Sequence, residues 1–222
     1  MTTTLITGAN RGIGLALAIA AADAGHTVLG TARDPASASA LRDAGATILP
    51  LDVADPDSID ALARALAGRP IDILVNNAAI YPDKSPLEQT DLDAFDRCMR
   101  TNVRGPLAVT RALLPNLHAG KRKTVAHISS SMGSIAQMNR GGSYAYKVSK
   151  TAVNMIAKSM AAELPGFTVL AIDPGWVRTD MGGDKADLTP EHSARGVLAV
   201  IERSTPDQSG AFLRYDGAAL PW

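Results

Sequence analysis

Two residues four positions apart, Tyr146 and Lys150, have side chains that could together transfer a proton. On a helix this spacing places both side chains on one face, about one turn apart. An ammonium near a phenol favours the phenolate, so we expect Lys150 to lower the tyrosine pKa from its reference value of ~10. Such a tyrosine can give or take a proton near neutral pH, while a serine hydroxyl holds the substrate oxygen. Lysine is common, so the pair needs support from the rest of the chain.

Three glycines, Gly8, Gly12 and Gly14, lie between a short apolar stretch at residues 3–7 and an Ala/Leu-rich stretch at 13–24. Glycines let the backbone turn tightly and approach a pyrophosphate, whose charge is favoured by a helix N-terminus. A glycine loop between a strand and a helix is the setting of a dinucleotide site. The spacing Gly-x-x-x-Gly-x-Gly differs from the standard Rossmann fingerprint.

The elements that position these residues alternate along the chain. Strands are predicted at residues 3–7, 27–33, 47–51, 71–75, 124–129, 168–172 and 210–215. Helices are predicted at 13–24, 37–44, from 55 onward, 91–114, 146–164 and 189–202, with a loop at 81–90. The helix at 91–114 is disturbed at Asn102 and at Gly105-Pro106, and an asparagine inside a helix usually points to solvent. The pattern predicts one α/β domain over residues 1–222, a Rossmann-type doubly wound parallel sheet with helices on both faces.

In such a sheet, ligands bind beyond the carboxyl ends of the strands. Chemically useful residues follow six of the predicted strands at that edge: Gly8 to Gly14, Arg33, Asp52, Asn76, Ser130, and Pro174 to Thr179. Turn residues would not be expected to converge in this way by coincidence, so we expect one binding site there.

Composition narrows the possible functions. The 222 residues include 22 basic and 22 acidic side chains, spread along the chain, so nothing favours nucleic acid or an anionic membrane as a partner. No signal peptide and no apolar stretch long enough to span a bilayer is recognisable. The single Cys98 cannot form an intrachain disulfide, and His26, His118 and His192 have no metal-ligand spacing. We expect a soluble, cytoplasmic protein without a metal.

Taken together, the motifs resemble the classical short-chain dehydrogenases/reductases over essentially the whole chain. Four stretches match family motifs: the glycine run from Thr7 to Gly14, Asn76-Asn77-Ala78-Ala79, the Tyr146 to Lys150 pair, and Pro174-Gly175. The run from Pro174 to Met181 and the ending Tyr215 to Trp222 look more like the carbonyl-reductase and C-factor-like branch. Two departures are Ala79, where the family has glycine, and a somewhat longer loop between Ser130 and Tyr146.

The resemblance implies a catalytic set of Asn102, Ser130, Tyr146 and Lys150. Tyr146 would be the general acid in carbonyl reduction and the base in alcohol oxidation, and Lys150 would also hold the nicotinamide ribose. Ser130 would bind the substrate oxygen, with Ser129 and Ser131 as alternatives. Asn102 would keep its helix kinked and support a water-linked proton path to Lys150.

The resemblance also assigns cofactor contacts. The pocket would be formed by the glycine loop and by residues that follow other strands. These are Asp52 and Val53 at the adenine, Asn76 and Ala78 on the adenosine side, and Pro174, Val177 and Thr179 at the nicotinamide. The loop contributes Gly8, Asn10, Arg11, Gly12, Ile13 and Gly14.

Two arginines predict NADP(H) rather than NAD(H). NAD-preferring members usually have an acid at the position of Ala32, whereas here Arg33 follows at once. Arg can grip a 2′-phosphate through two parallel hydrogen bonds, and Arg11 could reach the same phosphate. Asp34 could partly offset Arg33.

The substrate side is expected to be open, because only residues 182–188 separate Met181 from the helix that starts near Thr189. We expect a pocket for bulky apolar carbonyl compounds, with walls at Met132, Tyr144, Trp176 and Met181.

The leading interpretation is therefore an NADPH-dependent reductase of aldehydes or ketones, acting reversibly as a homodimer or homotetramer. One alternative is a cofactor-sensing signalling or regulatory protein that keeps the fold but not the chemistry, against which the full catalytic set argues. Another is an epimerase or dehydratase of the extended branch, against which the glycine spacing and the short C-terminal part argue.

Overall fold

The computed structural model describes residues 1–82 and 84–222, so Asp83, inside the predicted loop at 81–90, lies outside the described residues. One parallel sheet holds seven strands in the order β3-β2-β1-β4-β5-β6-β7. The strands are β1 (Thr3–Ile6), β2 (Thr27–Ala32), β3 (Thr47–Pro50), β4 (Ile73–Asn76), β5 (Thr124–Ile128), β6 (Thr168–Asp173) and β7 (Ala211–Arg214). This confirms the predicted doubly wound parallel sheet.

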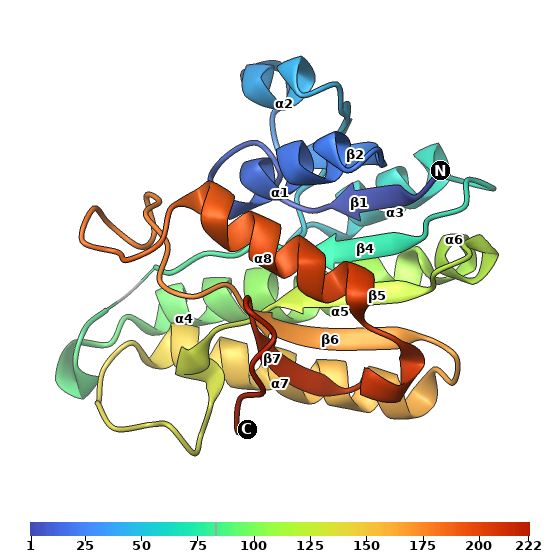
Figure 1. Ribbon diagram of the computed structural model, residues 1–222. Helices are drawn as coiled ribbons and strands as arrows, with labels where there is room; N and C mark the ends of the chain where they lie inside the picture. The colour runs from blue at the N-terminus through green and yellow to red at the C-terminus, as the bar shows by residue number, and fades with distance from the viewer. Residues whose placement is uncertain (83) are drawn as a thin grey trace.

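Helices cover both faces of the sheet (Figure 1). One face packs against α1 (Gly12–Asp23), α2 (Ser39–Asp43) and α8 (Pro190–Arg203), and α1 and α8 lie side by side. The other face packs against α3 (Pro56–Ala65), α5 (Gly105–Ala112), α6 (Leu114–Ala119) and α7 (Tyr144–Glu163), and α4 (Leu92–Met99) packs against α7. Because both faces are covered, β4, β5 and β6 are buried along their whole length, which explains their nearly continuous apolar sequence.

Local signals set several helix starts. The side chain of Asp55 accepts a hydrogen bond from Asp57 N at 3.0 Å, with Pro56 in the first turn of α3. Thr189 caps α8 in the same way, because its Oγ1 accepts a hydrogen bond from His192 N at 3.2 Å. Asp34 instead caps a short 3₁₀ turn, Pro35–Ser37, so the helix expected at 37–44 shortens to α2.

The long helix expected at 91–114 is divided. A π-helical turn, Arg100–Arg104, separates α4 from α5, and α6 begins after a break at Leu113. The π turn includes Asn102, where the sequence predicted a disturbance. Asn102 does not point to solvent as interior asparagines usually do, because its side chain is buried and bonds to backbone outside its helix.

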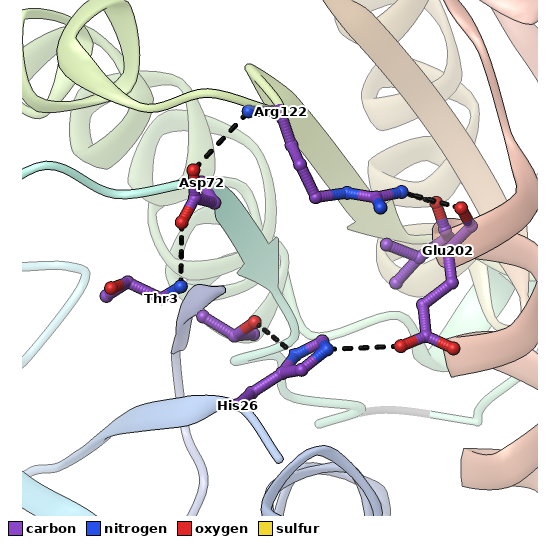
Figure 2. Close-up of polar contacts among 7 residues, drawn as sticks. Thr3, His26, Asp72, Arg122 and Glu202 are labelled. Atoms are coloured by element: carbon purple, nitrogen blue, oxygen red, sulfur yellow. Dashed lines mark hydrogen bonds and ion pairs between the residues drawn. The ribbon is translucent and has the colours of Figure 1, made fainter. Parts of the chain in front are cut away.

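The opposite edge of the sheet, where the strands begin, is held by polar contacts (Figure 2). Asp72 accepts hydrogen bonds from Thr3 N at 2.8 Å and Lys121 N at 2.7 Å, which joins the start of β1 to the segments just before β4 and β5. His26 contacts Thr4 Oγ1 at 2.9 Å and Glu202 Oε1 at 3.1 Å. These contacts tie the start of the sheet to the end of α8, far from the carboxyl ends of the strands.

No helix among the described residues is long and apolar enough to cross a membrane. Within the same residues, no cluster of His, Cys, Asp or Glu is arranged to hold a metal ion.

Candidate active site

The glycine turn after β1 is built by its neighbours. Gly8 has φ +64°, a left-handed conformation, and a Cβ at Gly14 would lie 2.3 Å from the Gly8 carbonyl oxygen. Thr7 Oγ1 accepts hydrogen bonds from the backbone N–H groups of Asn77 and Ala78, both at 3.0 Å. Asn77 Nδ2 donates to the carbonyl oxygens of Thr7 and Gly8 at 2.9 and 3.0 Å. The end of β4 therefore fixes the shape of the glycine turn.

This turn fits the pyrophosphate of a dinucleotide. Helix α1 starts directly after it, and no side chain caps its first turn. Uncapped N–H groups at a helix N-terminus, together with the helix dipole, favour an anion. Gly12, with φ +54°, lies against Thr179, since a Cβ there would be 3.3 Å from Thr179 Cγ2. The glycine loop thus borders the segment after β6, where a nicotinamide was predicted.

Asn76 stays a predicted cofactor contact, while the side chain of its neighbour Asn77 is the one that bonds to the glycine turn. Asn76 is the last residue of β4 and is buried; its Nδ2 donates to Thr110 Oγ1 at 3.0 Å, away from the glycine turn. The signal for Asn77 was its position directly after the strand.

Tyr146 and Lys150 lie on α7, as their spacing predicted. Lys150 Nζ is 5.4 Å from the centre of the Tyr146 ring and donates to the Ile128 carbonyl oxygen at 2.7 Å. Both side chains are buried, with 8% of Tyr146 and 3% of Lys150 exposed. The ammonium is thus held by the end of β5 beside the phenol, on the binding edge of the sheet.

The expected effect on the tyrosine pKa was wrong. Burial raises the pKa of Tyr146, and the negative charge of Asp173 raises it further, while a hydrogen bond with Ser130 lowers it; the net pKa lies above the usual value. Burial also lowers the pKa of Lys150 to about 8. Burial of the phenol is thus the main influence on its pKa, and Tyr146 keeps its proton at neutral pH.

Of the three serines after β5, the surroundings single out Ser130. It is hydrogen-bonded with Tyr146, and its Oγ accepts from Met132 N at 3.1 Å, which starts the 3₁₀ turn Ser131–Gly133. Ser129 is buried and donates to Asn154 Oδ1 at 2.6 Å, so its hydroxyl faces the interior. Ser131 is exposed. The geometry favours Ser130 over both alternatives.

Asn102 connects the π turn to the active-site helix. Its Oδ1 accepts from Ile80 N and its Nδ2 donates to Ile80 O, both at 2.8 Å, and Nδ2 also reaches Ser149 Oγ at 3.0 Å. Ser149 directly precedes Lys150 on α7. Asn102 therefore links the loop after β4 to the helix that carries the Tyr/Lys pair.

Tyr81 also belongs to the site, although no sequence signal distinguishes it. Its ring stacks on Tyr146, with ring centres 4.2 Å apart and planes 16° from parallel. Its hydroxyl is 2.7 Å from Ser143 Oγ, and Ser143 has φ +56° at the start of α7. A non-glycine residue held in that conformation costs roughly 1–2 kcal/mol. Tyr81 thus helps to fix the start of the helix that carries Tyr146.

The remaining predicted cofactor residues lie along the same edge. Arg33 follows β2 and is exposed; Asp52 and Val53 follow β3, and Asp52 Oδ1 accepts from Ala54 N at 2.9 Å. Arg11 forms an exposed ion pair with Asp180 at 2.8 Å. Ala78 lies against Gly8, and the segment after β6 supplies the last three: Pro174, Val177 and Thr179.

The four predicted substrate walls come from two segments. Met132 and Tyr144 are half-buried beside Ser130 and Tyr146 in the chain, and Met181 is half-buried after β6. Trp176 is 53% exposed, and its Nε1 donates to Gly182 O at 2.9 Å, which holds the indole against its own loop.

A contact that the sequence does not reveal holds the loop after Ser130. Residues after β7 fold back, and Ser134 Oγ donates to Pro221 O at 2.6 Å, while Ala136 N donates to Trp222 O at 2.9 Å. Trp222 stacks on Phe212 with ring centres 5.4 Å apart. The last residues of the chain therefore support the loop between Ser130 and Tyr146.

Comparison with known proteins agrees with this geometry. The family model described as short chain dehydrogenase matches residues 2–188. A protein named C-signal from Myxococcus xanthus is 43% identical over 164 residues, which is 73% of this chain and 99% of that protein.

Two solved structures match over the whole chain. Carbonyl reductase Sniffer of D. melanogaster superposes with a TM-score of 0.94 and 31% identity, covering 100% of both chains. NADPH-bound carbonyl reductase from chicken fatty liver superposes with a TM-score of 0.93 and 32% identity, covering 100% of this chain and 99% of that one.

Proposed function

The chain belongs to the short-chain dehydrogenase family as an NAD(P)-dependent oxidoreductase, and we propose that it reduces an aldehyde or ketone with NADPH, reversibly. The observation that carries this proposal is the placement of Tyr146, with its hydrogen bond to Ser130 and with Lys150 beside its ring. A hydroxyl that can bind an oxygen atom, a phenol that can protonate it and a cation beside the phenol thus meet at the edge that also carries the glycine turn.

The roles of the residues follow from their surroundings. The glycine turn and Lys150 would hold a nicotinamide cofactor, which would supply the hydride. The Ser130 hydroxyl binds the carbonyl oxygen, and the Tyr146 hydroxyl gives its proton to that oxygen as negative charge develops. Because burial keeps Tyr146 protonated at neutral pH, the enzyme holds the donor form that reduction needs. Lys150 holds the nicotinamide ribose and places a positive charge near the phenol.

Asn102 serves as a support rather than a proton donor to substrate. Its side-chain contacts hold the π turn against Ile80 and Ser149. These contacts hold α4 and α7 in a fixed position relative to each other. A water-linked proton path would end at Lys150 on α7.

The cofactor is proposed to be NADP(H). Arg33 follows the buried Ala32 at the end of β2, so no carboxylate occupies the position that would bind a ribose hydroxyl and repel a phosphate. The carboxylate of Asp34 accepts from Ala36 N at 3.0 Å and is engaged in its own turn. One solved neighbour is described as bound to NADPH, which supports the same choice.

The test is a screen of aldehydes and ketones with NADPH and NADH in parallel. Turnover is measured as the loss of absorbance of the reduced cofactor. We expect turnover of bulky apolar carbonyl compounds with NADPH and far weaker turnover with NADH. Turnover with NADH only would contradict the cofactor proposal, and no turnover of any carbonyl compound would contradict the reductase proposal.

One observation favours a second candidate, a signalling protein, because a relative with 43% identity is named C-signal. In that case the chain would bind NADP(H) and undergo no turnover. The same screen separates the two, since a sensor shows cofactor binding by fluorescence with no consumption of the reduced cofactor by any substrate.

A further inference from the structure

A buried carboxylate lies beside the proposed active site without a place in the reaction described above. Asp173 is the last residue of β6, is 4% exposed, and pairs in register with Arg214 of β7. Its Oδ1 accepts from Gly175 N at 3.3 Å, and its carboxylate also accepts from the backbone of Ser131. Acidic side chains are rarely fully buried unless they are paired. A buried Asp173 beside the active site therefore indicates a specific role.

Asp173 lies between the two loops that form the proposed substrate site. Ser131 directly follows Ser130, and Gly175 begins the segment that carries Trp176 and Val177. The backbone oxygen of Asp173 accepts from Tyr215 N at 2.8 Å, which fixes the residue to the end of β7 as well. One side chain therefore joins the loops after β5 and β6.

The charge of Asp173 also acts on the proton-transfer pair. It raises the pKa of Tyr146, after the larger effect of burial, and it opposes the fall in the pKa of Lys150. The pKa of Asp173 itself is raised above its ordinary value of 3.8, because burial outweighs the Ser131 and Gly175 N–H groups and the charges of Arg214 and Lys150, all of which lower it. Among the described residues, the other titratable groups around this cluster include Tyr81, Cys98 on α4, His127 on β5 and Asp216, which pairs with Arg214.

We propose that Asp173 is a positioning residue for the reaction: its carboxylate holds the Ser130 loop against the segment after β6 and places a negative charge beside Tyr146 and Lys150. The proposal rests on the reductase function argued above. It makes Asp173 a residue that acts through Ser130 and Tyr146 rather than on the substrate itself.

The test compares pH profiles of kcat for carbonyl reduction in the parent, Asp173→Asn and Asp173→Ala. Asn keeps an acceptor of similar shape and removes the charge. The phenol and the ammonium should then lose their protons more readily, so the alkaline limb should move to lower pH by about half a unit or more. Asp173→Ala also removes the acceptor and should lower kcat by about tenfold in addition.

The matched control is Asp184→Asn, which removes an exposed carboxylate from the segment after β6. Its profile should superpose on that of the parent. The affinity for NADPH should change by no more than about twofold in Asp173→Asn, because the loops and not the glycine turn are affected. An Asp173→Asn profile that superposes on the parent profile would overturn the proposal.

A second measurement needs no variant that might fail to fold. Carbon-13 carboxyl resonances of the parent protein report the ionisation of Asp173 across pH 6–10, the range in which Tyr146 would work. The proposal expects an ionised Asp173 throughout, and a protonated Asp173 over this range would overturn it. An inactive parent would overturn the proposed function, whereas this titration still tests whether Asp173 is the charge beside Tyr146.

Discussion

At the scale of single residues, Arg33 is the side chain on which the cofactor proposal depends. A charged hydrogen bond contributes roughly 1.5–3 kcal/mol, so Arg33→Ala should lower kcat/KM for NADPH by about 10- to 150-fold. The value for NADH should barely change, because NADH lacks the 2′-phosphate. The measurement is kcat/KM for both cofactors, and equal losses would show that Arg33 does not bind the phosphate.

Arg11 gives a second prediction, because in this structure it is paired with Asp180 at 2.8 Å. Both side chains are mostly exposed, 69% and 81%, so the pair contributes at most about 1 kcal/mol. If Arg11 must leave Asp180 to bind the phosphate, Asp180→Asn should lower the KM for NADPH by up to about fivefold. The effect should vanish when Arg11→Ala is present as well. An equal change in the KM for NADH would contradict competition for Arg11.

The sequence predicted the placement of the Tyr/Lys pair, because residues four positions apart on a helix lie on the same face. It did not predict that Asn77 shapes the glycine turn, because that role depends on where β4 ends. It also gave the wrong direction for the Tyr146 pKa, since the depth of burial is not visible in the spacing of two residues. Tyr81 was missed because its stacking on Tyr146 joins distant segments of the chain.

At the scale of elements, the 3₁₀ turn after Ser130 must approach α7 closely. A Cβ added at Gly133 would lie 2.7 Å from the Lys150 carbonyl carbon, which is backbone and cannot swing aside. Gly133→Ala should therefore push the turn from the helix, shift Ser130 and lower kcat by about tenfold or more. It should also cost about 1–3 kcal/mol of stability through overpacking.

The control for this prediction is Gly141→Ala in the loop that follows, where a Cβ would meet no atom within 4 Å. Both variants are compared by steady-state kinetics and by urea unfolding. If Gly133→Ala and Gly141→Ala had the same activity as the parent, the close packing of the turn against α7 would not position Ser130.

The division of the helix at 91–114 shows where prediction from sequence stops at this scale. The disturbance at Asn102 was visible, because asparagine is a poor interior helix residue. Its form as a π turn was not, because it depends on contacts with Ile80 and Ser149 from other segments. Likewise, the support that Ser134 receives from Pro221 joins residues 87 positions apart.

At the scale of the whole molecule, the sheet is held together at the edge opposite the active site by Asp72 (Figure 2). Burial alone would raise the pKa of Asp72, but the backbone N–H groups of Thr3, Lys121 and Arg122 outweigh it and hold the pKa below its ordinary value of 3.8. A carboxylate with a lowered pKa stabilises the fold above that ordinary value, and this contribution is lost as the pH falls through the pKa of the folded state.

Asp72→Asn should consequently lower the free energy of unfolding at pH 7 by about 1–3 kcal/mol. The difference from the parent should shrink as the pH falls below about 4. Urea unfolding at several pH values measures both, with Asp60→Asn on the exposed side of α3 as the control. A difference that stays constant down to pH 2 would show that the charge of Asp72 is not responsible. Activity per folded molecule should be unchanged, because Asp72 lies far from the carboxyl ends of the strands.

The overall architecture was the part that the sequence predicted most completely. Alternating strand and helix patterns imply a parallel sheet, and a parallel sheet places its loops at one edge. The finer arrangement of buried polar groups, such as Asp173 beside Tyr146, depends on how segments pack and emerged only from the structure.

The central claim is that Tyr146 gives the proton that completes carbonyl reduction. Its most direct test is kcat with NADPH in the parent and in Tyr146→Phe, with NADPH binding measured by fluorescence and Tyr215→Phe as the control. We expect Tyr146→Phe to bind NADPH within a few-fold of the parent and to lose at least ~10²-fold in kcat, the usual scale of general acid catalysis. Near-normal turnover in Tyr146→Phe would contradict the claim.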